Sequence, residues 1–122
     1  SSAVPIPLMR YPHVLTIYAE AKARAEGPDK LAYDCVNAIR TRAGLTALSG
    51  LSASEFANAV VQERAWEFAS EYSRWHDLVR LEMVAKANSN RDPIEIAIPK
   101  SITEGDYIFP FPYSDLMLNP NL

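Results

Sequence analysis

The sequence predicts a mostly α-helical fold, and three observations point to it. Apolar residues recur at spacings of three and four in three separate segments, which is the period of one helix face. Residues that start and stop helices bound these segments. Prolines and aromatic residues without such a period fill the end of the chain. We therefore expect a helical hairpin, then one long or broken helix, and then an irregular proline-rich C-terminal tail.

The composition indicates an ordinary globular protein. The chain has 122 residues, of which 48% are hydrophobic and 22% charged, and we expect a single domain over residues 1–122. A net charge of -3 argues against nucleic acid as a partner. The single cysteine, Cys35, excludes an internal disulfide, and its apolar neighbours predict a core thiol. Because the chain does not begin with Met, we expect a processed product, an expression fragment or both.

The first two helices are predicted to form an antiparallel hairpin. Prolines delay the first helix until after Pro12, so that it runs from His13 to Glu26. Gly27-Pro28 stops it, Asp29 can cap the second helix, and Gly44 ends that helix. The apolar face of the first helix holds Val14, Tyr18, Ala21 and Ala25, with Leu15 and Ala19 beside it. The stripe of the second holds Ala32, Val36, Ile39 and Ala43.

The third helix carries the most informative stretch, residues 62–81. It opens with a capping box formed by Ser52 and Glu55. Its apolar stripe is continuous if the helix is unbroken: Val61, Ala65, Phe68, Tyr72, Trp75, Val79 and Met83. We expect no left-handed backbone at Tyr72. After Ala87 the helix ends, and the alternating residues 94–98 predict a short edge-like strand.

Charged side chains surround this stripe and form a predicted structural network. Its members are Glu63, Arg64, Glu67, Glu71, Arg74, Asp77 and Arg80. Opposite charges lie three residues apart in the pairs Arg64 with Glu67, Glu71 with Arg74, Arg74 with Asp77, and Asp77 with Arg80. Two tryptophans lie among these charges, so we expect the network to be partly buried. Arg74→Ala or Asp77→Ala should then lower stability by about 2 kcal/mol or more.

Four blocks of this sequence, in order, resemble the SusD/RagB family. ERAWEFASEYSRWHDLVR follows the family's Glu-Arg pair, two further glutamates and Arg-Trp-x-Asp-Leu-x-Arg. RYPHVLTIYAEAKARAEG and LAYDCVNAIRTRAGL resemble its hairpin, and YIFPFPYSDLMLNPNL resembles its closing motif. The family usually has Gly where this chain has Tyr72, and a Gly there implies a break in the helix. Family members are several times longer, so the resemblance implies a C-terminal portion.

The resemblance also implies a function. SusD/RagB proteins are surface lipoproteins of the outer membrane that capture oligosaccharides or other nutrients for a TonB-dependent, SusC-like transporter. Their hairpins are tetratricopeptide-like, and their ligand residues lie largely upstream of these motifs. From the residues themselves we expect no catalytic, cofactor or metal residue here: arginines lie among the glutamates, His13 and His76 lack metal-ligand spacing, and there is no Gly-rich phosphate loop. Trp66, which lies off the apolar stripe, is the candidate for a ligand contact.

Two alternatives from other classes stay open. One is a helical scaffold that binds a protein segment. The other is a glycosidase that uses Glu63, Glu67 and Glu71, which recur every four residues on one helix face. The arginines among these glutamates favour a structural interpretation, because they would hold the carboxylates ionised and occupied.

Overall fold

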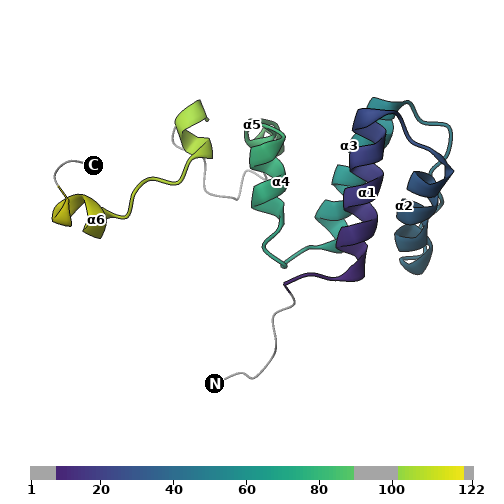
Figure 1. Ribbon diagram of the computed structural model, residues 1–122, viewed down its shortest axis with the longest axis horizontal. Helices are drawn as coiled ribbons and strands as arrows, with labels where there is room; N and C mark the ends of the chain where they lie inside the picture. The colour runs from purple at the N-terminus through teal and green to yellow at the C-terminus, as the bar shows by residue number, and fades with distance from the viewer. Residues whose placement is uncertain (1–7, 90–101, 120–122) are drawn as a thin grey trace, which may run out of the picture. The chain divides into compact units, whose positions relative to one another are not determined.

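The computed structural model describes residues 8–89 and 102–119, and all regular structure within these ranges is helical. Figure 1 shows the helices α1 (Tyr11–Ala25), α2 (Lys30–Arg42), α3 (Ala53–Glu67), α4 (Arg74–Arg80), α5 (Val84–Asn88) and α6 (Tyr113–Leu118). A 3₁₀ turn, η1, spans Glu104–Tyr107. The mostly α-helical prediction is confirmed. The strand predicted at residues 94–98 lies outside the described residues.

The chain divides into two compact units, Ser1–Trp75 and His76–Leu122. The single domain expected from the sequence over residues 1–122 stays a prediction. In the described part of the chain, no helix is both long enough and apolar enough to cross a membrane.

In the first unit, α1 packs against both α2 and α3 (Figure 1). The core cluster consists of Ala19, Ala23, Ala32, Cys35, Val36, Phe56, Ala57 and Val60. Four of these residues are alanines, whose small side chains allow the helices to approach closely. Cys35 is buried as expected, and this burial raises the pKa of its thiol. The hairpin predicted for the first two helices is α1 and α2.

Most helix ends follow the sequence signals. The Asp29 carboxylate accepts a hydrogen bond from the Ala32 backbone N–H at 2.8 Å, and Ser52 and Glu55 form the predicted capping box. Gly44 has a φ of 75°, and the N–H of Leu45 donates to the Arg40 carbonyl at 2.8 Å, as in a Schellman motif.

The start of α1 differs from the prediction. The helix begins at Tyr11, so Pro12 lies inside its first turn. The first four N–H groups of a helix have no partner within the helix, so a proline there removes no intrahelical hydrogen bond. Pro12 is therefore part of the first turn of α1 and does not delay the helix.

The side of α1 that packs is not the apolar face found from periodicity. Its buried residues are Thr16, Ala19, Glu20 and Ala23. Most of the residues on the predicted apolar face are exposed, and so are Tyr11 and Ile17 beside them. We call this exposed set the outer face of α1; it consists of Tyr11, Val14, Ile17, Tyr18, Ala21 and Ala25. On α2 the predicted stripe is buried at Ala32, Val36 and Ile39, whereas Ala43 is exposed at the helix end.

The third predicted helix is broken. It ends at Glu67, and the chain resumes helical structure only at Arg74. Ser70 and Tyr72 have φ values of 68° and 62°, so the prediction that Tyr72 avoids the left-handed region is wrong. The predicted stripe is therefore interrupted: Phe68 is buried, whereas Tyr72 is 78% exposed. The backbone at Tyr72 takes the conformation that a glycine would adopt most easily.

In the second unit, α4 ends in another Schellman motif. The N–H of Met83 donates to the Leu78 carbonyl at 2.8 Å, with Glu82 at a φ of 52°. Thr103 precedes η1 as its cap, and its N–H donates to the Asp106 carboxylate at 2.8 Å. The aromatic residues that follow η1 are exposed; they are Phe109, Phe111 and Tyr113.

Candidate functional site: the arginine–carboxylate network at the end of α3

The network at the end of α3 is organised by Arg10, the residue that precedes α1. The backbone of Arg10 is extended, and its N–H donates to His13 Nδ1 at 3.2 Å. This hydrogen bond satisfies one of the N–H groups at the start of the helix. It also fixes the direction in which the Arg10 side chain leaves the backbone, toward α3.

The Arg10 guanidinium binds two carboxylates and one carbonyl. Its Nε and Nη2 donate to Glu71 Oε2 and Oε1 at 3.0 and 2.8 Å, a bidentate arrangement. Its Nη1 donates to Glu67 Oε1 at 2.9 Å, and Nη2 also donates to the Glu67 carbonyl at 2.9 Å. The last bond satisfies the Glu67 carbonyl in the final turn of α3, for which the helix itself supplies no N–H donor. Arg10 therefore joins the start of α1 to the end of α3 and to the segment after it.

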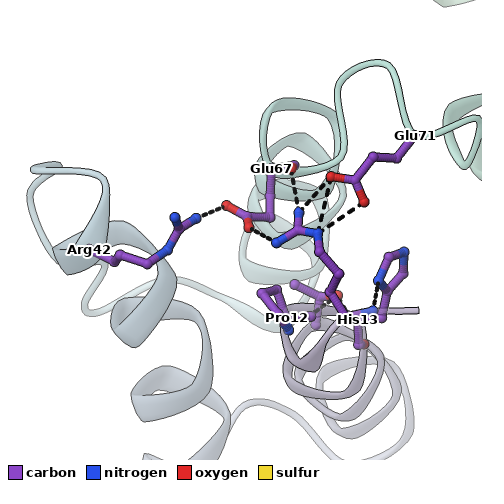
Figure 2. Close-up of polar contacts among 7 residues, drawn as sticks. Pro12, His13, Arg42, Glu67 and Glu71 are labelled. Carbon is purple, nitrogen blue, oxygen red and sulfur yellow. Dashed lines mark hydrogen bonds and ion pairs between the residues drawn. The ribbon is translucent and has the colours of Figure 1, made fainter. Parts of the chain in front are cut away.

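Two arginines from α2 complete the pairing. Figure 2 shows Arg42 reaching Glu67 from the neighbouring helix, with Glu71 on the other side of the site. Arg40 Nη1 donates at 2.7 Å to Oε2 of Glu63, which lies one turn before Glu67 on α3. The Glu63 side chain is only 3% exposed. Each of the three glutamates of the α3 stretch is thus paired with an arginine distant in the sequence. The predicted local partners of Glu67 and Glu71, Arg64 and Arg74, are not their partners here.

Arg64 is buried and turns toward α1 instead. Its Nη1 donates to Thr16 Oγ1 at 2.9 Å, and that hydroxyl lies 2.9 Å from the Pro12 carbonyl, to which it donates. The Phe68 ring contacts three side chains, those of His13, Arg10 and Arg64. It stacks on His13 with ring centroids 3.7 Å apart, and the guanidinium carbons of Arg10 and Arg64 are each 5.3 Å from its centroid. Phe68 therefore supports the arginines as well as filling the core.

The electrostatics favour the ionised forms of Arg10 and Glu71. Hydrogen bonds from Arg10 lower the pKa of Glu71, although burial acts in the opposite direction. The bonds to Glu71 and Glu67 raise the pKa of Arg10 in return. A general acid in a glycosidase needs a carboxyl group whose pKa is raised. Glu71 has the opposite property, which makes it unsuited to that role.

The remaining network residues follow the break in the helix. In the second unit, Asp77 is 3% exposed and accepts from Arg80 Nε and Nη2 at 3.0 and 2.8 Å. This pair is the predicted one. In the first unit, Ser73 Oγ and Arg74 Nη1 are buried without a hydrogen-bond partner among the described residues. The residues of the predicted network thus form several separate groups of contacts and not one continuous network among the described residues.

Trp66 lies apart from these ion pairs. This residue is 58% exposed on the last turn of α3, and Gln62 and Asn58, one and two turns earlier, are exposed as well. An open cavity of about 460 Å³ in the second unit was not anticipated from the sequence. Its lining is Val79, Glu82, Ile102, Thr103, Glu104, Tyr107 and Ile108. These residues share no motif or period, so no sequence signal could have grouped them.

Comparisons with known proteins agree with each other. The whole chain, residues 1–122, matches the model of the SusD family. Two relatives from Formosa agariphila are SusD-like protein P2, 35% identical over 93% of this chain, and SusD-like protein P25, 29% identical over 94%. A crystal structure of a SusD superfamily protein from Parabacteroides distasonis superposes with a TM-score of 0.78, at 35% identity over 93% of this chain.

These relatives are much longer than 122 residues. The chain spans 24% and 22% of the two Formosa proteins and 25% of the Parabacteroides chain. It therefore corresponds to about a quarter of each relative's length.

Proposed function

The chain belongs to the SusD family, and from this premise we propose that it is part of an outer-membrane component that captures glycans or other nutrients. In this proposal the longer protein is a surface lipoprotein that passes its oligosaccharide to a SusC-like, TonB-dependent transporter. The observation that carries the proposal is the family match over all 122 residues, supported by the structural likeness to a SusD superfamily protein.

The geometry does not favour catalysis by the glutamates at the end of α3. The carboxylates that a glycosidase would need are those of Glu63, Glu67 and Glu71, and all three are engaged by arginines. Carboxylates that arginines already engage stabilise helix packing and are poorly placed to donate a proton to a leaving sugar. We assign the network to fixing the geometry of α1, α2 and the end of α3.

The candidate ligand contact is the outward row of α3. Trp66 offers an exposed ring face, against which the C–H groups of a sugar ring can pack. Gln62 and Asn58 offer amide groups that can hydrogen-bond to sugar hydroxyls. A short row of this kind can make only a few contacts, so the main part of the capture site would come from the rest of the longer protein.

The experiment is a calorimetric titration of the longer protein with a panel of oligosaccharides, with the 122-residue chain titrated in parallel. The longer protein should bind at least one oligosaccharide more tightly than about 1 mM, and the isolated chain should bind more weakly than this, about -4 kcal/mol. Micromolar binding by the isolated chain would show that the site lies within residues 1–122. Binding of a protein segment, with no glycan bound, would support the scaffold alternative.

The role of Trp66 can be separated from the function itself. In the longer protein, Trp66→Ala should weaken oligosaccharide binding about tenfold, or about 1.4 kcal/mol. Thr41→Ala, an exposed position on α2, is the control and should leave the affinity unchanged. Unchanged affinity in both variants would remove Trp66 from the site. It would leave the proposed function standing if the longer protein still binds.

A further inference from the structure

The cavity in the second unit is large enough to hold a small organic molecule. Its volume of about 460 Å³ lies within the range of about 300 to 1,000 Å³ that is typical of ligand pockets. Its walls come from the end of α4, from Glu82 just after that helix, and from η1 with the residues on either side of it. All lining residues belong to one compact unit, so the cavity can be described from that unit alone.

One part of the lining is apolar. Val79 on the last turn of α4, Ile102 before η1 and Tyr107 at its end are each partly buried. Ile108 lines the same cavity and is 75% exposed. A ligand with an apolar body would remove this surface from water, which is favourable.

The charged part of the lining is acidic. Glu82 and Glu104 are both exposed, and in the described part of the chain neither carboxylate forms an ion pair or accepts a hydrogen bond. No lysine, arginine or histidine is among the described residues that line the cavity. Because a carboxylate without a partner attracts a cation and repels an anion, the lining selects for a positively charged ligand.

The backbone at Glu82 supports a role in binding. Glu82 has a φ of 52°, in the left-handed region, and takes the position in the Schellman motif after α4 that usually holds glycine. A Cβ atom makes this conformation costly. Residues held in such conformations are concentrated at ligand sites. Here the unfavourable position carries one of the two carboxylates of the cavity.

An organic cation fits the cavity better than a metal ion does. A calcium ion takes about six to eight oxygen ligands. Within residues 8–89 and 102–119, no group of three His, Cys, Asp or Glu side chains could hold a metal ion. A bare ion would also leave the apolar walls in water. An ammonium group on an apolar body uses both parts of the lining, and the Tyr107 ring can add a cation–π contact.

We propose that this cavity binds a small organic ammonium ion, with the cationic group at Glu82 and Glu104 and the apolar body against Tyr107 and Ile108. Both carboxylates are exposed to water, so each contributes modestly and the affinity is in the micromolar to millimolar range. The site differs in chemistry from the row that contains Trp66. It does not rest on the proposed function, because the ligand that it selects need not be a sugar.

The test compares three probes of similar size in ligand-observed NMR titrations of the longer protein. At neutral pH, 2-phenylethylamine carries an ammonium group, 2-phenylethanol carries a neutral hydroxyl in its place, and phenylacetate carries a carboxylate. The amine should bind with a Kd of about 1 mM or lower, and at least about fivefold more tightly than the alcohol. Phenylacetate should bind more weakly than either. Added NaCl should weaken the binding of the amine and not that of the alcohol.

Charge-removing variants locate the site. Glu82→Gln and Glu104→Gln keep the size of each side chain, and each should weaken amine binding about threefold and leave alcohol binding unchanged. Asp34→Asn is the control, because it removes an exposed carboxylate of the first unit that pairs only with Lys30. It should leave the binding of all three probes unchanged. If a glutamine variant disturbs folding, the salt dependence and the comparison of amine with alcohol in the unmodified protein still decide the result.

Four outcomes would overturn the proposal. The first is the absence of amine binding at about 10 mM, about ten times the expected Kd. The second is equal binding of the amine and the alcohol, which would show an apolar pocket without selection for charge. The third is amine binding that neither glutamine variant weakens, which would place the probe elsewhere. The fourth is tighter binding of glucose than of the amine, weakened by the same variants, which would identify a sugar site.

Discussion

Glu67 and Asp77 lie ten residues apart in the same charged stretch, yet they are paired in opposite ways. Glu67 binds Arg10 and Arg42, which are distant in the sequence, whereas Asp77 binds Arg80, three residues along the same helix. The spacing of charges predicted local pairs for both. In the described structure, the local pair forms for Asp77 and not for Glu67.

The difference follows from what surrounds each helix. The end of α3 packs in a unit where α1 and α2 bring three arginines to its carboxylates. Arg10, moreover, lies at a helix start, where its backbone N–H is held by His13 Nδ1. Charge spacing therefore predicts pairs well on a helix considered alone. It fails where a neighbouring helix supplies a better placed cation.

The largest expected effect is at Arg40. Arg40→Ala leaves the Glu63 carboxylate buried without its arginine, so stability should fall by about 3 kcal/mol in urea unfolding. Lys30→Ala removes an exposed pair with Asp34 and is the control, with an expected change below about 0.5 kcal/mol. Equal effects of the two substitutions would mean that the pairs between helices are no stronger than surface pairs.

Asp77→Ala tests the local side of the comparison. The buried carboxylate accepts two hydrogen bonds from Arg80, so its removal should cost about 2 kcal/mol. The effect should be smaller than at Arg40, because the remaining Arg80 side chain is 43% exposed and can be hydrated. A change in stability indistinguishable from zero would mean that this pair contributes no more than an exposed surface ion pair.

Tyr72→Gly should raise stability by up to about 1 kcal/mol, because glycine adopts a positive φ without the steric cost that a side chain imposes. The exposed Tyr72 side chain loses little packing. Tyr72→Ala keeps the Cβ atom and is the matched control, which should bring no gain. A stabilising alanine together with a destabilising glycine would exclude backbone strain as the cause.

The smallest effect concerns acid. Because Arg10 lowers the pKa of Glu71 below the ordinary 4.5, the folded state binds fewer protons than the unfolded state in that range. The contribution of Glu71 is complete above pH 4.5 and is lost as the pH falls through the lowered pKa. Urea midpoints measured from about pH 6 to about pH 3 should therefore fall less steeply for Glu71→Gln than for the unmodified chain. An unchanged slope would mean that Arg10 does not favour the ionised form.

Much of the fold could be predicted from the sequence, because caps and breakers act locally. Asp29, Gly44 and the Ser52 capping box all lie where their signals placed them. The break after α3 was missed, because the apolar period continues through Tyr72 although the backbone does not. Apolar periodicity shows which residues share a helix face only where the backbone is continuously helical.

The candidate site was harder to predict. The sequence predicted a charged network that includes Glu63, Glu67 and Glu71. It did not predict that Arg10, Arg40 and Arg42 bind these glutamates, because those contacts depend on how the helices pack. The apolar face of α1 shows the same limit: its residues were identified from their period, and the structure leaves them exposed. Periodicity identifies which residues share a helix face, but it does not show which face packs against a neighbour.

The most direct test of the comparison is a pair of double-mutant cycles that share Glu67. One combines Arg10→Ala with Glu67→Ala, and the other combines Arg64→Ala with Glu67→Ala, each followed by urea unfolding. The structure predicts a coupling of about 1 to 3 kcal/mol for Arg10 with Glu67 and below about 0.5 kcal/mol for Arg64 with Glu67. The reverse order, with the local pair coupled and the distant pair independent, would contradict the claim that arginines from other segments hold the end of α3.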